Sequence, residues 1–189
     1  MRVFWRWGRY GMAALAVLAA AAGAYGAELA RPEVRVDGNL ARVDLALDGA
    51  FTEEFVAQLE SGLPSGFVYD LELDRDRQWF DKTLATSKLQ VVAMYDAATR
   101  GYLVNYKLDG KLVESRMVRE VADVERAMTR IDGLPAFHLD AYPRSWRLLV
   151  RARAAVGSRT VLYFFPARAI TDWRESGKFR SLNPLPDGG

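Results

Sequence analysis

The sequence contains no cysteine and one histidine, His138. Without cysteine there are no disulfide bonds, no thiol catalysis, no cysteine metal ligands and no thiol for lipid attachment. A zinc site would have to rest on one histidine and carboxylates, which is a poor ligand set. His138 precedes Asp140 by two residues, but no nucleophile elbow and no glycine-rich phosphate loop accompanies them. We therefore expect no catalytic residue, no metal and no cofactor.

A hydrophobic run long enough to cross a membrane is also missing. The apolar segment 12–24 is shorter than the roughly 20 residues that a membrane-spanning helix needs. Basic residues precede this segment and small residues follow it up to Ala27, which is the pattern of a secretory signal peptide. We expect residues 1–27 to be a signal peptide and the protein to be periplasmic or exported. The alternative is a retained signal anchor that holds it at the inner membrane, facing the periplasm.

An excess of positive charge is absent once this segment is set aside. The chain has 26 Lys and Arg against 24 Asp and Glu residues, and Arg2, Arg6 and Arg9 belong to the expected signal. The remaining 23 basic residues are slightly outnumbered by acids. This removes the main argument for a nucleic acid partner.

What the sequence does contain is a repeated alternation of apolar and polar residues, which is typical of strands with one buried face. Half of the residues are apolar and 12% are aromatic, so a chain of 189 residues can bury one core. Asp37-Gly38 and Asp109-Gly110 are dipeptides that favour tight hairpin turns. The alternation predicts strands at 33–47 (two, around the first turn), from about 67, and at 89–95, 102–108, 111–117, 145–156 and 160–165.

Two segments have helical spacing instead. Thr52 is an N-cap candidate for a helix with Phe55, Val56, Leu59 and Leu63 on one side, and Gly62-Leu63-Pro64 ends it. A second helix is expected from about Val121 to Ile131, ended by Gly133-Leu134-Pro135. We therefore predict a mainly β fold, an antiparallel β-sandwich or open barrel with two short helices, after an N-terminal signal helix. Residues 28–180 would form this single domain and 181–189 a flexible tail.

The acidic segment 70–81 admits several interpretations. Its carboxylates have the spacing of a calcium loop, but Arg75 stands where the loop requires glycine, and Asp81 replaces the final glutamate. The alternation fits a strand better, with Phe67, Tyr69, Leu71 and Leu73 facing the core. Asp70, Glu72, Asp74 and Asp76 would then face water. Arg147, Arg151 and Arg153 share one face of a later strand and are expected to pair with these acids, although they could instead bind phosphate or a lipid head group.

Arg75 and Arg77 continue the inward phase of the same strand, and two outcomes remain open. Either they point inward and need a carboxylate such as Asp81 or Asp96, or the strand bulges after Leu73 and leaves both in solvent, with Trp79 covering the sheet edge. Tyr102, Val104, Tyr106 and Leu108 form an aromatic stripe, read as core packing, with a ligand groove as the alternative.

A resemblance rests on the same residues. Gly62-Leu63-Pro64, then the alternation from Phe67 through Arg75-x-Arg77-x-Trp79-x-Asp81, then Tyr95-Asp96-x-x-Thr99-x-x-Tyr102 resemble the exported bacterial family called domain of unknown function 4390. The resemblance covers about 34–173. It implies an envelope location and no particular reaction.

These observations favour a non-enzymatic envelope protein that binds another envelope protein. The expected contact surface is a rim formed by Arg75, Arg77, Trp79, Asp81, Tyr95 and Asp96. An apolar-ligand or lipid carrier, with a cavity lined by Tyr102 and Tyr106, is the alternative. A hydrolase using two of Asp70, Glu72, Asp74 and Asp81 is a third hypothesis, and an alternating solvated face is the wrong place for it.

Overall fold

The computed structural model describes residues 26–77, 81–157 and 169–182. Over these ranges the chain is mainly β with two helices, as the alternation predicted. The expected signal segment 1–25 and the strand expected at 160–165 lie outside the described residues. The helices are α1 (Glu53–Glu60) and α2 (Val121–Thr129). The strands are β1 (Glu28–Leu29), β2 (Glu33–Asp37), β3 (Leu40–Asp48), β4 (Ser65–Arg75), β5 (Lys82–Asp96), β6 (Gly101–Leu108), β7 (Lys111–Val118), β8 (Arg130–His138), β9 (Leu148–Gly157), β10 (Ala169–Ile170) and β11 (Arg174–Glu175).

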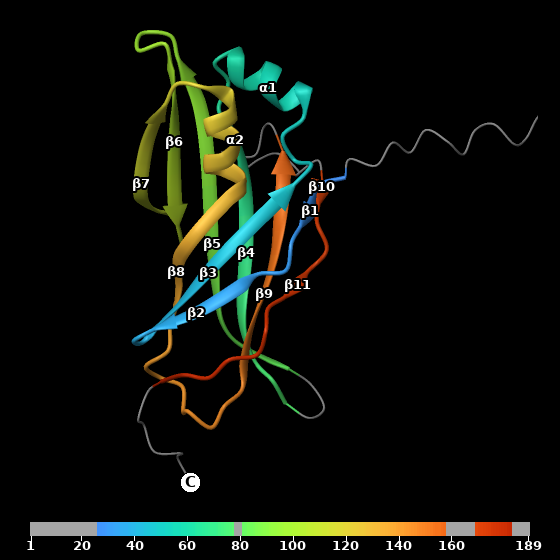
Figure 1. Cartoon of the computed structure of the whole chain (residues 1–189), viewed down its shortest axis with the longest axis vertical. Coiled ribbons are helices and arrows are strands. Elements are labelled where there is room, and N and C mark those ends of the chain that lie inside the picture. Colours follow the sequence, from blue (N-terminus) through green and yellow to red (C-terminus); the bar gives the residue numbers. More distant parts are fainter. Residues whose placement is uncertain (1–25, 78–80, 158–168, 183–189) are drawn as a thin grey trace, which may run out of the picture.

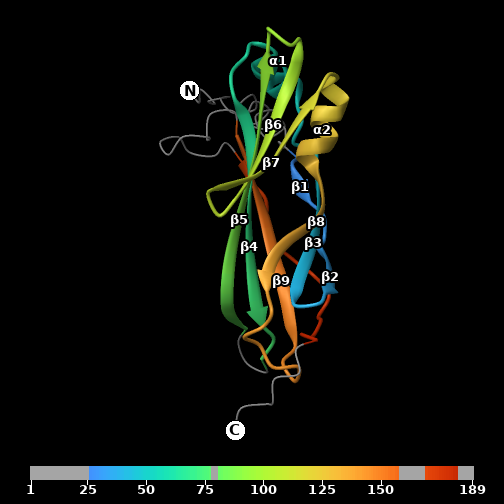
Figure 2. The ribbon, with the colours of Figure 1, turned by 90° about the vertical axis from the view of Figure 1, so that its left-hand side faces the viewer.

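The strands form two antiparallel sheets that pack as layers and do not close into a barrel (Figures 1 and 2). The large sheet has the order β10-β9-β4-β5-β6-β7, and β11 also pairs with β9. In the small sheet β3 is central: β1 and β2 pair with successive stretches of it, and β8 pairs with it over residues 40–46. The expected sandwich is therefore observed, with the small sheet crossing one face of the large one.

The core lies between the sheets because each sheet directs its apolar phase inward. Phe67, Tyr69, Leu71 and Leu73 on β4 are buried, as the alternation predicted. Alternate residues of β3, from Ala41 to Leu47, are buried opposite them. Successive side chains along a strand point to opposite faces, so the intervening residues of β4 lie on the outer face of the large sheet.

Helix α1 closes one end of the sandwich (Figure 1). Thr52 caps it as predicted, because its hydroxyl accepts a hydrogen bond from the Phe55 backbone N–H at 3.3 Å. Phe55 and Leu59 are buried, and the Phe55 ring stacks on Phe67 with centroids 4.9 Å apart. Leu63 does not continue the apolar stripe, since it is exposed beyond the end of the helix.

The second helix is shorter than predicted, and the strand after it was missed. Helix α2 ends at Thr129, and residues 130–138 form β8 instead of a last helical turn and a loop. Two buried tyrosines fix this end of α2: the Tyr69 hydroxyl donates to the Met128 carbonyl and the Tyr106 hydroxyl to the Ala127 carbonyl, both at 2.8 Å. The chain then extends along β3, and register shifts in that pairing accommodate Gly133 (φ 62°) and Pro135.

The aromatic stripe on β6 is core packing, as predicted. Tyr102, Val104 and Tyr106 are buried against the small sheet and α2, and Leu108 is half-buried. The two predicted hairpin turns are also confirmed, since Gly38 and Gly110 have positive φ values of 59° and 82°. These angles are costly for residues with a Cβ, which explains the glycines.

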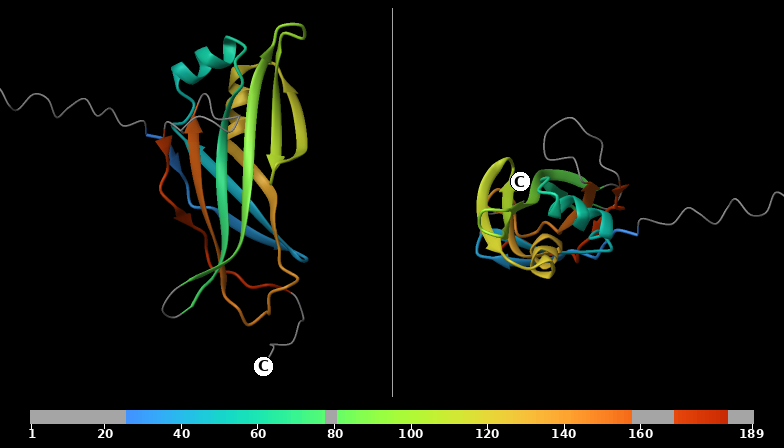
Figure 3. Two further views of the ribbon diagram at one scale, coloured as in Figure 1. Left: turned by 180° about the vertical axis from the view of Figure 1, so that it is seen from behind. Right: turned by 90° about the horizontal axis from the view of Figure 1, so that it is seen from above.

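The C-terminal segment runs along the free edge of β9 (Figure 3). Strands β10 and β11 pair with β9, and Phe179 and Leu148 exchange two backbone hydrogen bonds of 2.8 and 2.9 Å. Ser181, which the sequence placed in a flexible tail, is buried, and its hydroxyl donates to the Leu139 carbonyl at 3.4 Å. The large sheet is thereby extended on the β9 side.

Candidate functional site

The acids of β4 pair with the arginines of β9, as the charge pattern predicted. Asp70 lies opposite Arg153 and Glu72 opposite Arg151 in the register of the two strands. The Arg151 Nη2 to Glu72 Oε2 distance is 2.6 Å, and Arg153 Nη2 lies 3.2 Å from Asp70 Oδ2. Cross-strand pairs of opposite charge stabilise a sheet. The arginine row is therefore engaged within the molecule.

Asp74 departs from the prediction that the acids face water. It is fully buried (0% exposed), and a register shift between Leu73 and Asp74 interrupts the pairing with β5 at this point. Arg151 Nε lies 2.6 Å from Asp74 Oδ2, so one guanidinium serves both Glu72 and Asp74. Within the described residues neither oxygen of Asp74 has a partner at hydrogen-bond angles, so this ion pair is what compensates the buried charge.

Asp76 is held by two cations from different parts of the chain. Arg147 Nη2 and Lys178 Nζ both lie 2.9 Å from its Oδ2. The hydrogen bond from Lys178, together with the charge of Arg147, lowers the pKa of this carboxyl below its ordinary value. The contact joins the end of β4 to the C-terminal segment.

This alternation of acids and cations bears on the hydrolase hypothesis. Paired-carboxylate catalysis needs two acids directed at one point with separated proton affinities. Here Asp70, Glu72, Asp74 and Asp76 are directed at arginines and lysines, and none of these contacts joins two acids. These ion pairs therefore hold neighbouring strands together. Among the described residues, no group of His, Asp and Glu side chains is placed to hold a metal ion.

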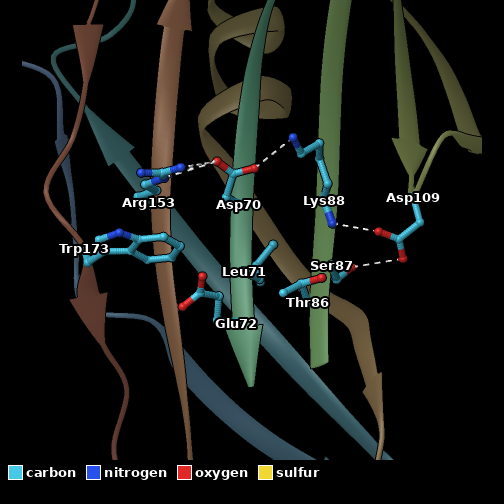
Figure 4. A pocket seen from close by; sticks show the side chains of 9 residues that line it. All are labelled: Asp70, Leu71, Glu72, Thr86, Ser87, Lys88, Asp109, Arg153 and Trp173. Carbon is cyan, nitrogen blue, oxygen red and sulfur yellow. Dashed lines mark hydrogen bonds and ion pairs between the residues drawn. The ribbon is translucent and has the colours of Figure 1, made fainter. Parts of the chain in front are cut away.

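Beside this ladder the outer face has a hollow of about 310 Å³, here called the outer hollow. Trp173 stands on one side of it and Asp109 on the other, and β9, β4 and β5 supply the residues between them (Figure 4). The sequence pattern indicated Asp70 and Glu72 but not Trp173, which is 101 or more positions away from them in the chain. The lining residues are Asp70, Leu71, Glu72, Thr86, Ser87, Lys88, Asp109, Arg153 and Trp173.

Of the predicted rim residues, Arg75 ends β4, and Arg77 and Asp81 lie in the connection between β4 and β5. The Arg75 guanidinium lies 3.7 Å from the centre of the Trp146 ring, so the half-buried Arg75 makes a cation–π contact, and no described carboxylate forms an ion pair with it. Arg77 is exposed, and its backbone N–H donates to Asp81 Oδ1 at 3.3 Å. Trp79 lies outside the described residues. Arg77 lies in solvent, as the bulge interpretation expected. Arg75 follows neither expected outcome, because Trp146 partly covers it.

Tyr95 and Asp96 lie far from Arg75, Arg77 and Asp81, so these five predicted residues do not form one surface. They end β5, a strand of 15 residues that begins beside Asp81, and a strand of that length spans about 50 Å. Asp96 accepts hydrogen bonds from the Thr99 hydroxyl and the Ala98 N–H, both at 2.9 Å. These bonds lower the pKa of Asp96, and they make it the residue that shapes the 96–101 turn. A binding role for the six residues stays a prediction.

A second feature is the free edge of the large sheet at β7. Strand β7 pairs with β6, and no described strand pairs with its other edge. Three apolar side chains on it are more than half exposed, Leu112 (59%), Val113 (55%) and Met117 (51%). The sequence alternation identified this strand but not that it would be an edge, because pairing order is a tertiary property.

A groove of about 300 Å³ separates β7 from β8, here called the lateral groove. Its floor includes Leu89, Tyr106 and Leu108, and Leu134 lies on the β8 side. Arg116 lies over the Tyr106 ring at 5.1 Å and is paired with Glu114 on the same strand. The groove is thus partly apolar, and two of its charged residues, Glu114 and Arg116, are paired with each other.

These features belong to a mainly β sandwich with no recognisable catalytic set among the described residues. Residues 24–174 match the family described as Domain of unknown function (DUF4390), and the chain belongs to this family. The resemblance noted in the sequence is thereby confirmed. No curated protein and no solved structure matches the chain. Neither described helix has the length and apolar character required to span a bilayer.

Proposed function

We propose that this chain is a non-enzymatic binding protein of the cell envelope, whose partner is another envelope protein that adds an extended segment to the edge of β7. The envelope location rests on the signal-like pattern of residues 1–27. The protein–protein role rests chiefly on one observation, the exposed apolar edge of the large sheet. The predicted rim at Arg75–Asp81 is the second candidate contact.

An unpaired strand edge offers backbone N–H and C=O groups that a second chain can pair with. Natural proteins usually protect such edges with charge or irregularity, because edges otherwise aggregate. Strand β7 has both kinds of protection at its start, namely Lys111 and a register shift at Tyr106/Lys107, yet it exposes Leu112, Val113 and Met117. An edge that is protected at its start and apolar further along favours pairing with one specific partner over non-specific aggregation.

The test places a photo-crosslinking residue at Leu112 in intact cells, with Leu63 as the matched position because it is 53% exposed and lies on another element. We expect one protein to be captured from Leu112 and not from Leu63. When the crosslinker is placed at another β7 position, capture of the partner should be lost in the double variant Leu112→Lys/Met117→Lys. Both replaced side chains are more than half exposed, so the fold should be unchanged.

Hydrogen exchange then distinguishes strand addition from other contacts. If the captured protein pairs with β7, amides of residues 111–118 that exchange rapidly in the isolated chain should become protected in the complex. Equal crosslinking from Leu63 and Leu112, or amide protection confined to Arg75–Asp81, would show that the contact is not at β7.

The lateral groove supports a second candidate, an apolar-ligand carrier. Tyr106, one of the two tyrosines expected to line such a cavity, is at its floor, but Tyr102 is not among its lining residues. Mass spectrometry of the native protein would show a co-purifying lipid in that case. The groove is half polar and open, and an acyl chain requires an apolar and enclosed one, so we rank this function second.

A further inference from the structure

The outer hollow is on the face of the large sheet opposite the core, whereas the lateral groove opens between the sheets. Its floor crosses neighbouring strands of the sheet, so the side chains there are held by the β ladder. Trp173 and Asp109 approach from segments outside those strands and give the hollow its walls (Figure 4). The hollow is therefore built by parts of the chain that are distant in sequence.

Most charged side chains of this hollow are paired with an opposite charge, whereas Asp109 is held by neutral donors. Asp70 lies 3.2 Å from both Lys88 Nζ and Arg153 Nη2, with a different carboxylate oxygen toward each cation. Glu72 is paired with Arg151. Asp109 accepts the Lys88 backbone N–H at 2.8 Å and the Ser87 hydroxyl at 3.3 Å. Both cations that line the hollow, Lys88 and Arg153, are paired with Asp70, so neither is free to hold an anionic ligand.

These groups still have capacity for further hydrogen bonds. An ionised carboxylate has about four acceptor sites, a guanidinium five N–H donors and an ammonium three. Lys88 uses one donor on Asp70, and Arg153 directs two at the same carboxylate. Thr86 adds an exposed hydroxyl. The floor thus presents alternating donors and acceptors with fixed geometry, which suits a ligand that carries several hydroxyl groups.

Trp173 supplies what these polar groups lack, a flat apolar surface. Its ring lies 4.6 Å from the Arg153 guanidinium and 5.4 Å from that of Arg151, and these two cation–π contacts hold the indole in place. A fixed aromatic ring costs little conformational entropy when a ligand packs against it. A pyranose ring has one face of C–H groups and a rim of hydroxyls, so it matches an aromatic wall beside a polar floor.

We propose that the outer hollow binds a glycan, with a pyranose ring against Trp173 and its hydroxyls on Asp70, Thr86 and Lys88. The ligand is an uncharged stretch of polysaccharide or oligosaccharide, because the two cations that line the hollow are already paired with Asp70. This binding does not depend on β7, so the protein contact and the glycan contact can exist together or separately.

The test is an NMR titration of the full-length chain with chitotetraose, maltotetraose and inorganic phosphate in separate experiments. We expect at least one tetrasaccharide to shift the Trp173 indole N–H and the Thr86 and Ser87 amides with saturation, and phosphate to leave them unchanged. The comparison of the two tetrasaccharides shows whether N-acetyl groups are required. A response to phosphate alone, or to none of the three, would refute the proposal.

Two variants locate the binding. Trp173→Ala should weaken it by about tenfold or more, and Thr86→Val, which keeps a strand-favouring shape and all ion pairs, should weaken it by a smaller factor. Trp146→Ala is the matched control, because Trp146 stacks on Arg75 away from the hollow and its loss should leave glycan binding unchanged. Binding that survives both Trp173→Ala and Thr86→Val would place the glycan elsewhere.

Discussion

Replacing Arg151 by methionine should destabilise the fold by about 3–5 kcal/mol, the usual result of leaving a buried charge without its partner. Asp74 is fully buried, and Arg151 is the cation in contact with it, at 2.6 Å. Methionine preserves much of the side-chain volume but removes the charge. The free energy of unfolding from urea titrations measures the effect.

The double variant Arg151→Met/Asp74→Leu separates the ion pair from simple packing. An apolar pair of similar volume can replace a buried ion pair with little loss, so most of the stability should return. Arg153→Met is the control, because Asp70 is partly exposed and keeps Lys88, and its cost should be about 1 kcal/mol. Equal losses in Arg151→Met and Arg153→Met would show that the burial of Asp74 does not matter.

Removing the hydroxyls of Tyr69 and Tyr106 should cost about 1–3 kcal/mol each, because each leaves a buried carbonyl at the end of α2 without its donor. The two bonds hold Met128 and Ala127, one residue apart, so the double variant Tyr69→Phe/Tyr106→Phe should loosen α2 from the sheet. Tyr102→Phe is the control: Tyr102 is buried on the same strand as Tyr106, but its hydroxyl makes no hydrogen bond with the part of the chain that the structure describes. Hydrogen exchange of the α2 amides gives the local readout.

The same tyrosines predict an alkaline limit to stability. Burial raises the pKa of both Tyr69 and Tyr106 above the ordinary value of 10.0. Above about pH 10 the unfolded chain loses these protons while the folded chain keeps them, so the folded state binds more protons and stability falls as pH rises. The slope can reach about 1.4 kcal/mol per pH unit for each tyrosine. Tyr69→Phe/Tyr106→Phe should therefore unfold with a shallower alkaline slope, and an unchanged slope would contradict this assignment.

The elements that were predicted correctly are those whose cause is local. Thr52 with the two acids after it defines the start of α1, and Asp37-Gly38 defines a hairpin turn, because cap and turn chemistry acts over a few residues. The buried phase of β4 followed from alternation alone. The prediction of a last turn in the second helix was wrong. Tyr69 and Tyr106, from other strands, hydrogen-bond to the end of α2, and the residues that follow pair with the edge of β3.

The candidate sites were predicted less well, because they depend on which strands become neighbours. The pairing of Asp70 and Glu72 with the β9 arginines was recoverable, since both rows alternate and carry opposite charge. The burial of Asp74 was not, because it needs a register shift that alternation does not encode. Tyr95 and Asp96 were grouped with Arg75 by a shared family pattern, yet a long strand separates them.

By itself the sequence determined the class of fold, the positions of most strands, the inward face of β4 and the membership of the family, since each follows from periodicity or motif over short distances. Tertiary structure alone decided that no described strand covers the outer edge of β7, that β8 is a strand, and that Trp173 lines the same hollow as Asp70 and Lys88. The physical reason is that strand order and the path of the C-terminal segment are settled by burying both sheets against each other, which no local pattern in the chain records.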